Sequence, residues 1–295
     1  MPPDSHIHII DPERYPMDPE RDYTPKAATV KNATEWQQKH GISHSVIVLP
    51  SVYGTNNSVL IDALNTFSGS CRGVVVVDPE NISNETLAEF HAAGVRGVRV
   101  NYGNEGTNDE IVEAVKKNAK VAKVHDWNLQ LWIPIKAMKE LVGVIPDLGV
   151  RVVLDHYGHA MAGSRTNVTA NTYDPYSITG FSELISLVQR KLVFVKISAP
   201  YQNSKSAPLY EDMRVIGQTI MINAPDMVVF GSDWPHTASK EGNAAAGGRL
   251  NPQDFRNIDD AGLIKQTVEW AASEEQVRRL FVDNPRRLWQ FYKDE

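Results

Sequence analysis

Short apolar runs, each rich in β-branched residues, alternate along the chain with longer stretches in which apolar residues recur at helical spacing. The runs are too short for helices, and this alternation is typical of βα units built around a parallel sheet. The predicted strands are Ser5–Ile10, Ser45–Leu49, Gly73–Val77, Val98–Asn101, Leu129–Pro134, Arg151–His156, Leu192–Ser198 and Met227–Asp233. About eight strands close a (β/α)8 TIM barrel of about 250 residues, so a distorted α/β barrel is expected.

The predicted helices lie between these strands and after the last one. They are Lys26–His40, Asn57–Phe67, Asn84–Ala93, Asp109–His125, Ile135–Ile145, Ser177–Gln189, Leu209–Asn223 and a final stretch, Glu274–Phe291, that breaks at Asn284-Pro285. A doubly wound open sheet would place a glycine-rich phosphate loop after the first strand, where the sequence reads His8-Ile-Ile-Asp11-Pro12 instead. Because no internal repeat or long polar linker divides the chain, residues 1–295 are expected to form a single barrel domain.

Composition narrows the classes of protein. The 295 residues include 30 Lys and Arg against 36 Asp and Glu, a formal charge of -6, and no segment has a basic face, which argues against a nucleic-acid partner. No apolar run reaches the ~18 residues of a membrane helix, and Met1 to Ile10 lack the pattern of an export signal. The single cysteine, Cys71, cannot form an internal disulfide, so a cytoplasmic location is expected.

Polar residues gather where the apolar runs end, which is the face of a barrel that carries active sites. His6 and His8 are two apart and therefore lie on one side of the first strand. The sixth run ends in His156, whose phase with Val152 and Leu154 predicts that it points inward, and the eighth ends in Asp233. Each residue alone fits an ordinary structural role, such as a helix cap or a satisfied interior histidine. Because they come from strands far apart in sequence, together they favour a catalytic site.

These residues also carry a resemblance to a known family. His6-Ile-His8, Asp155-His156-Tyr-Gly158, Gly231-Ser-Asp233-Trp-Pro-His236 and Asn284-Pro285 together resemble the amidohydrolase-related (amidohydrolase 2) group over nearly the whole chain. Within it the chain looks most like the branch of 2-pyrone-4,6-dicarboxylate lactonases and sugar lactonases. Further matching stretches are Leu49-Pro-Ser51-Val-Tyr53-Gly54 and Arg96-Gly97-Val-Arg99-Val-Asn101.

The resemblance implies a hydrolase that opens a carboxylate-bearing lactone, of the pyrone dicarboxylate or sugar-acid type, without a metal cofactor. Trp132-Ile-Pro134 and Lys196-Ile-Ser198 stand where metal-rich amidohydrolases carry a carboxylated lysine and a further histidine, which argues against a two-metal site. If one Zn²⁺ or Mn²⁺ is bound, its ligands are His6, His8, His156 and Asp233.

Lactone hydrolysis needs a base, groups that polarise the carbonyl and a clamp for the ring. Asp233 is the expected base, and His6, His8 and His156 are the expected polarising groups. Arg99, in phase with Asn101, is expected to meet a substrate carboxylate, although an ion pair inside the barrel is the alternative. The other residues expected to orient the substrate are Ser51, Tyr53, Tyr157, Arg165, Lys196 and His236.

Three other activities compete with a lactonase. A neighbouring branch of the same group decarboxylates aromatic or muconate-type acids with Zn²⁺, and a lactone isomerase would use the same aspartate and histidines. A binding protein without turnover is the third alternative, but it has no reason to keep the full histidine and aspartate set. Aromatic residues near the C-terminus suit either a homo-oligomer interface or a helix packed on the barrel, and packing is preferred; they are Trp270, Phe281, Trp289 and Phe291.

Overall fold

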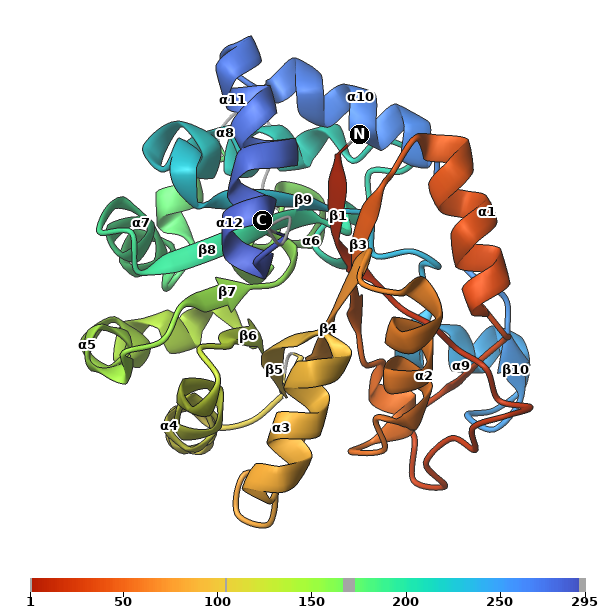
Figure 1. Ribbon diagram of the computed structural model, residues 1–295. Coiled ribbons are helices and arrows are strands. Elements are labelled where there is room, and N and C mark those ends of the chain that lie inside the picture. The colour runs from red at the N-terminus through yellow and green to blue at the C-terminus, as the bar shows by residue number, and fades with distance from the viewer. Residues whose placement is uncertain (1, 104, 167–172, 292–295) are drawn as a thin grey trace.

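Eight parallel strands form a barrel in the computed structural model, which describes residues 2–103, 105–166 and 173–291 (Figure 1). They are β1 (Pro3–Ile7), β3 (His44–Val48), β4 (Cys71–Val75), β5 (Val95–Asn101), β6 (Asn128–Trp132), β7 (Val152–Leu154), β8 (Val193–Ser198) and β9 (Val228–Gly231), and they pair in that order. Backbone hydrogen bonds from Asp233 N to His6 O (2.9 Å) and from His8 N to Trp234 O (2.8 Å) join the last strand to the first. The predicted (β/α)8 barrel is therefore confirmed.

Helices surround the strands on the outside (Figure 1). They are α1 (Val30–His40), α2 (Ser58–Phe67), α3 (Asn84–Ala93), α4 (Asn108–Val124), α5 (Met138–Leu148), α6 (Gly163–Thr166), α7 (Phe181–Gln189), α8 (Arg214–Asn223), α9 (Asn243–Ala246), α10 (Asp260–Trp270), α11 (Glu274–Arg278) and α12 (Asn284–Trp289). A small two-stranded sheet pairs β2 (Thr24–Pro25) with β10 (Pro252–Gln253). The sequence interpretation did not include α10.

The longest helix, α4, illustrates why these segments are helical. Thr107 and Glu110 form a capping box at its start, which satisfies backbone N–H groups that the first turn leaves without partners. Ile111, Val115 and Ala119 are buried at four-residue spacing on one face, which packs against β5 and β6.

The C-terminal helix differs from its prediction. A π-helical segment, Arg279–Asp283, joins α11 to α12, so the chain stays helical through Asn284-Pro285 instead of breaking there. Pro285 lies in the first turn of α12, where the missing N–H group of proline costs no hydrogen bond.

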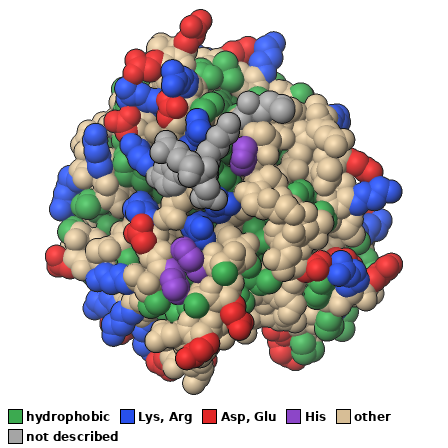
Figure 2. Space-filling view, in the orientation of Figure 1, with side chains coloured by type: hydrophobic (Ala, Val, Ile, Leu, Met, Phe, Trp, Pro, Cys, Tyr) green, Lys and Arg blue, Asp and Glu red, His purple; other side chains and the backbone are tan. Residues whose placement is uncertain are grey.

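The N-terminal end of the barrel is covered by α12, which lies in front of the strands in Figure 1. Asn128, at the start of β6, donates through Nδ2 to Leu288 O at 2.8 Å. On this side of the molecule acidic and basic side chains are interspersed (Figure 2). The four C-terminal aromatic residues are buried within the chain, as the packing interpretation predicted: Trp270, Phe281, Trp289 and Phe291. Within the described residues, no helix is long and apolar enough to cross a membrane.

Candidate active site

A cavity of about 370 Å³ opens at the C-terminal end of the barrel strands. This volume is within the range of small-molecule sites. Its floor comes from residues at strand ends, and its rim from the loops that follow them. The floor residues are His8, Arg99, Asn101, Trp132, His156 and Asp233, and the rim includes Asp22, Tyr23, Ser51, Tyr102, Glu105, Gln202, Thr237, Ser239, Lys240 and Glu241.

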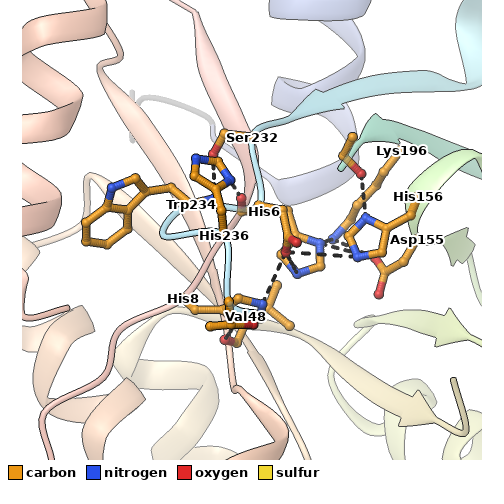
Figure 3. A network of polar contacts seen from close by, with 12 residues as sticks. His6, His8, Val48, Asp155, His156, Lys196, Ser232, Trp234 and His236 are labelled. Atoms are coloured by element: carbon orange, nitrogen blue, oxygen red, sulfur yellow. Dashed lines mark hydrogen bonds and ion pairs between the residues drawn. The ribbon is translucent and has the colours of Figure 1, made fainter. Parts of the chain in front are cut away.

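The imidazoles of His6, His8 and His156 lie close together at the centre of the site (Figure 3). The Nε2 atoms of all three rings lie near one carboxylate oxygen. Asp233 Oδ1 lies 3.4 Å from His6 Nε2, 3.3 Å from His8 Nε2 and 3.9 Å from His156 Nε2. All four side chains are nearly inaccessible to solvent. The four residues that the sequence suggested as catalytic are therefore brought together from three strand ends.

The backbone bends sharply where two of these side chains are presented. His156 has φ 49° and Asp233 has φ 67°, left-handed values that non-glycine residues adopt rarely and at a cost in free energy. The carboxylate of Asp4 accepts hydrogen bonds from His6 N (2.9 Å) and Ser232 N (3.0 Å), which holds the ends of β1 and β9 beside each other.

The strand phase assigned to the sixth strand was wrong. Asp155, two residues after Val153, points into the barrel, and Val153 pairs in register with Gln130. His156 reaches the site because its positive φ turns the chain after the strand ends, and not because it is in phase with Val152 and Leu154. The rule that successive side chains of a strand point to opposite faces no longer applies where the extended backbone ends.

A buried ionic network underlies the histidines. Lys196 Nζ, which is fully buried, donates to Gln130 Oε1 at 2.7 Å and lies 3.2 Å from both Asp155 Oδ1 and His6 Nδ1. Asp155 Oδ2 accepts from Gln130 Nε2 (2.9 Å) and from Arg99 Nη2 (3.2 Å). The carboxylate of Asp155 is thus shared by two cations, which compensates for its removal from water.

Electrostatics favour the ionised form of the Asp233 and Asp155 carboxylates and lower the pKa values of His6 and His156. Burial alone would raise the pKa of Asp233, but His156, His8 and His6 hold that pKa well below its usual value. Burial lowers the pKa of His156, and burial together with the nearby Lys196 ammonium lowers the pKa of His6 well below its usual value. Burial also lowers the pKa of Lys196 to about 8, against the opposing effect of Asp155.

The second oxygen of Asp233 is held from the opposite side. Tyr201 Oη donates to Asp233 Oδ2 at 2.7 Å and lies 3.2 Å from His236 Nδ1. His236 Nε2 lies 3.2 Å from Asp260, which also accepts from Trp36 Nε1 at 2.9 Å. Since Oδ2 is occupied in this way, Oδ1 is the oxygen left for chemistry.

The donor set fits a single divalent metal ion. His6 Nε2 and Asp233 Oδ1 are buried without a hydrogen-bond partner among the described residues. Each ring has its Nδ1 engaged elsewhere: His8 by Val48 O (2.7 Å), His156 by Ser198 Oγ (2.9 Å), and His6 by the Lys196 and Asp155 groups. Three Nε2 atoms held in this way, with one carboxylate oxygen, are a typical ligand set for Zn²⁺, and the groups behind them orient the rings.

The residues expected to orient the substrate divide into two groups. Ser51, Arg99 and Asn101 line the cavity. The other five do not line it. The Tyr53 hydroxyl accepts a hydrogen bond from Asp11 N, Tyr157 packs against Gly217, and Arg165 donates to Tyr201 O and pairs with Glu241. Lys196 lies beneath the histidines, and His236 lies behind Tyr201.

Sequence interpretation gave no catalytic role to several residues that contact this site, namely Gln130, Trp132 and Tyr201. Gln130 was detectable, because a polar residue between Leu129 and Leu131 has no ordinary place inside a barrel strand. Tyr201 follows β8 in a loop, where no pattern along the sequence indicates its direction.

Comparisons with known proteins identify relatives of this chain in sequence and in fold. The sequence model of a family described as Amidohydrolase matches residues 4–291. A 4-sulfomuconolactone hydrolase of Hydrogenophaga intermedia is 29% identical over 294 residues, which cover 98% of this chain and 89% of that protein. A 2-pyrone-4,6-dicarboxylate hydrolase of Comamonas testosteroni is 28% identical over 300 residues, covering 97% and 89%. A solved structure from Pseudomonas putida, provisionally assigned as a 2-pyrone-4,6-dicarboxylic acid hydrolase, is 25% identical and superposes with a TM-score of 0.76 over 99% of this chain and 98% of that one.

Proposed function

Because the chain belongs to the Amidohydrolase family, we propose that it is a hydrolase that opens a carboxylate-bearing lactone, with Asp233 as the general base. The observation that carries this proposal is the convergence of three imidazole Nε2 atoms on Asp233 Oδ1 at the floor of the cavity, which Arg99 also lines. The two curated relatives described above are named as hydrolases of a lactone and of a pyrone, which is a cyclic ester, and these names support the choice of substrate class.

In this mechanism Asp233 Oδ1 accepts a proton from a water molecule as the water oxygen bonds to the lactone carbonyl carbon. A proton acceptor has to be ionised, and the nearby imidazoles favour the ionised form of Asp233 by holding its pKa well below the usual value. The ester bond to the ring oxygen then breaks, and Asp233 returns the proton to that oxygen. Water is consumed, a carboxylic acid and a hydroxyl group are formed, and the base is regenerated.

The imidazoles face the point where negative charge develops on the carbonyl oxygen. The Nε2 atoms of His6 and His156, when they carry the proton of the ring, would donate hydrogen bonds to that oxygen, from a site with little access to water. His8 donates through Nδ1 to Val48 O, so its Nε2 atom would donate to the carbonyl oxygen only as an imidazolium. Arg99 would bind the substrate carboxylate and so hold the ring over Asp233. The buried Nε atom of Arg99 has no partner among the described residues, and its Nη2 atom is engaged by Asp155.

The same four side chains would hold a metal ion, namely His6, His8, His156 and Asp233. When bound, a divalent ion would polarise the carbonyl group or lower the pKa of a water molecule. The inference from sequence was that no metal is needed, and the fit of the donor set makes this the first point to test.

The test combines metal analysis of the purified protein with an assay of lactone opening. The panel includes a pyrone dicarboxylate and several aldonolactones, each assayed with and without a chelator. Opening that resists the chelator in metal-free protein supports catalysis by Asp233 and the histidines alone. Opening that requires one bound metal per chain keeps the lactonase but makes these residues ligands. If no lactone is opened and a metal-dependent decarboxylation is found instead, the proposed function is wrong.

A further inference from the structure

Two histidines of the site, His6 and His8, differ in the partner of the ring nitrogen that faces away from Asp233. His8 Nδ1 lies 2.7 Å from Val48 O (Figure 3). A carbonyl oxygen can only accept, so in the neutral His8 ring Nδ1 carries the hydrogen and Nε2 holds a lone pair. His6 Nδ1 instead lies 3.2 Å from Lys196 Nζ. An ammonium group can only donate, so the neutral His6 ring carries its hydrogen on Nε2, and the two rings are opposite tautomers.

A second group near His6 Nδ1 favours the other tautomer. Asp155 Oδ1 lies 3.4 Å from His6 Nδ1, and a carboxylate oxygen can only accept. That separation exceeds the usual upper limit of about 3.2 Å for an N–H···O hydrogen bond. The ammonium group of Lys196 therefore decides where the hydrogen of His6 lies. Without it, the carboxylate of Asp155 would attract that hydrogen to Nδ1.

The ammonium group of Lys196 is held by groups from several elements. It donates to Gln130 Oε1 at 2.7 Å, lies 3.2 Å from Asp155 Oδ1, and lies 5.3 Å from the centre of the Trp289 ring. The amide of Gln130 is oriented in turn, because its Nε2 donates to Asp155 Oδ2 at 2.9 Å. Since the side chain of Lys196 is fully buried, solvent does not compete for its hydrogens.

We propose that Lys196 is a positioning residue that keeps the hydrogen of His6 on Nε2, where it is donated to the carbonyl oxygen of the lactone. The inference rests on the proposed function for the use of that hydrogen, and it distinguishes His6 from His8. His6 Nε2 is buried and has no hydrogen-bond partner among the described residues, as expected of a donor that serves the substrate.

The position of this hydrogen also affects metal binding. The four ligand atoms are placed for a divalent ion, but a ring nitrogen that carries hydrogen has no lone pair for a metal. In His6 the lone pair lies on Nδ1, beside an ammonium group whose charge repels a cation at the site. Without Lys196, Asp155 would accept the Nδ1 hydrogen and free Nε2, which is the usual arrangement behind metal-binding histidines. Lys196 therefore weakens metal binding in the unaltered chain.

The test observes the ring nitrogens directly. In protein labelled with ¹⁵N-histidine, a nitrogen that carries hydrogen and a nitrogen with a lone pair have well-separated chemical shifts, so long-range ¹H–¹⁵N spectra give the tautomer of each ring. The signals are assigned with His6→Gln and His8→Gln. Spectra are recorded for the protein as isolated, for Lys196→Met, which removes the donor, and for Lys191→Met as a control. Lys191 is an exposed lysine that pairs with Asp226 at 3.4 Å and does not line the cavity.

A double variant separates the position of the hydrogen from the loss of a buried charge. In Lys196→Met/Asp155→Asn, the amide oxygen of the new side chain should take the place of Oδ2, which accepts from Gln130 and Arg99. Its NH₂ group then faces His6 Nδ1 and donates to it, so the hydrogen returns to Nε2 although the lysine is absent. The double variant also removes the carboxylate that the single variant leaves with one cation fewer.

We expect the protein as isolated to carry hydrogen on Nε2 of His6 and on Nδ1 of His8. In Lys196→Met the hydrogen of His6 moves to Nδ1, and kcat falls by about 10²-fold with little change in KM, as for the loss of one oxyanion donor. Zn²⁺, measured by calorimetry, binds this variant roughly tenfold more tightly than the unaltered protein. Lys191→Met matches the unaltered protein, and the double variant regains the Nε2 hydrogen and most of the lost kcat.

Three results would overturn the inference: hydrogen on Nδ1 of His6 in the protein as isolated, a metal ion bound at His6 Nε2 in that protein, or an unchanged tautomer in Lys196→Met. The last result would leave Lys196 only a structural partner of Asp155. If Lys196→Met does not fold, the unaltered protein and the double variant decide the question, and a double variant without the Nε2 hydrogen contradicts the inference. If the tautomers are as expected but no lactone is opened, only the proposed reaction is rejected.

Discussion

Replacing the proposed base, Asp233→Asn, tests the mechanism most directly. Tyr201 Oη donates to Oδ2, so the amide oxygen of the new side chain should take that position and direct its NH₂ group toward the three imidazole Nε2 atoms. An amide nitrogen cannot accept the proton of water. Since general bases contribute about 10²- to 10⁴-fold, we expect kcat to fall by about 10³-fold, which is about 4 kcal/mol in the activation barrier.

The assay follows lactone disappearance at saturating substrate, with the best lactone from the panel. Asp226→Asn is a matched control. Asp226 lies just before the first residue of β9, whereas Asp233 follows the last, and Asp226 pairs with Arg279 at 2.6 Å, away from the cavity. Circular dichroism and thermal melting establish that both variants fold, and metal analysis distinguishes loss of the base from loss of a ligand. If Asp233→Asn retains kcat within about tenfold of the unaltered protein, Asp233 is not the base.

Three further variants examine the groups around the base. Arg99→Met should raise KM for a carboxylated lactone far more than for a neutral one, and equal increases for both would mean that Arg99 serves only its ion pair with Asp155. Tyr201→Phe should lower kcat by roughly 10- to 100-fold, because it removes a hydrogen bond to a charged oxygen, while Tyr210→Phe, in the adjacent ring, should have little effect; similar losses in both would contradict this. Burial lowers the pKa of His159 to about 4, so the unfolded chain binds the proton first as pH falls below about 6.5, and stability decreases by up to about 1.4 kcal/mol per pH unit. Urea unfolding should therefore show that the free energy of unfolding decreases less between about pH 7 and pH 5 for His159→Gln than for the unaltered protein. Equal decreases would mean that His159 is not the source of the pH dependence.

The barrel was predictable because its signals are local and repeated. Every predicted strand overlaps an observed one, since buried β-branched runs cannot pack as anything else between amphipathic helices. The helix α10 was missed. The break expected at Asn284-Pro285 does not occur, because a π-helical segment leads directly into α12 and proline is acceptable in the first turn of that helix.

The site was predictable only in part, for a physical reason. His6, His8 and Asp233 end strands, so their position along the chain indicates their position in space. Asp155 takes the inward strand position that was expected of His156, and His156 also reaches the site because the backbone leaves the extended conformation there. Arg99 points inward as predicted, but its pairing with Asp155 depends on two strands whose contact no local pattern encodes.

The seam between the first and last barrel strands has a consequence for how activity is acquired. His6 and Asp233 face each other across that seam, and one of the two hydrogen bonds that close it joins the same two residues. During synthesis the first strand leaves the ribosome more than two hundred residues before the last one, so for most of that time the growing chain contains only one member of the proposed catalytic pair. Turnover therefore reports completion of the ring, and refolding followed by activity should lag behind refolding followed by helix content whenever closure is the slowest step.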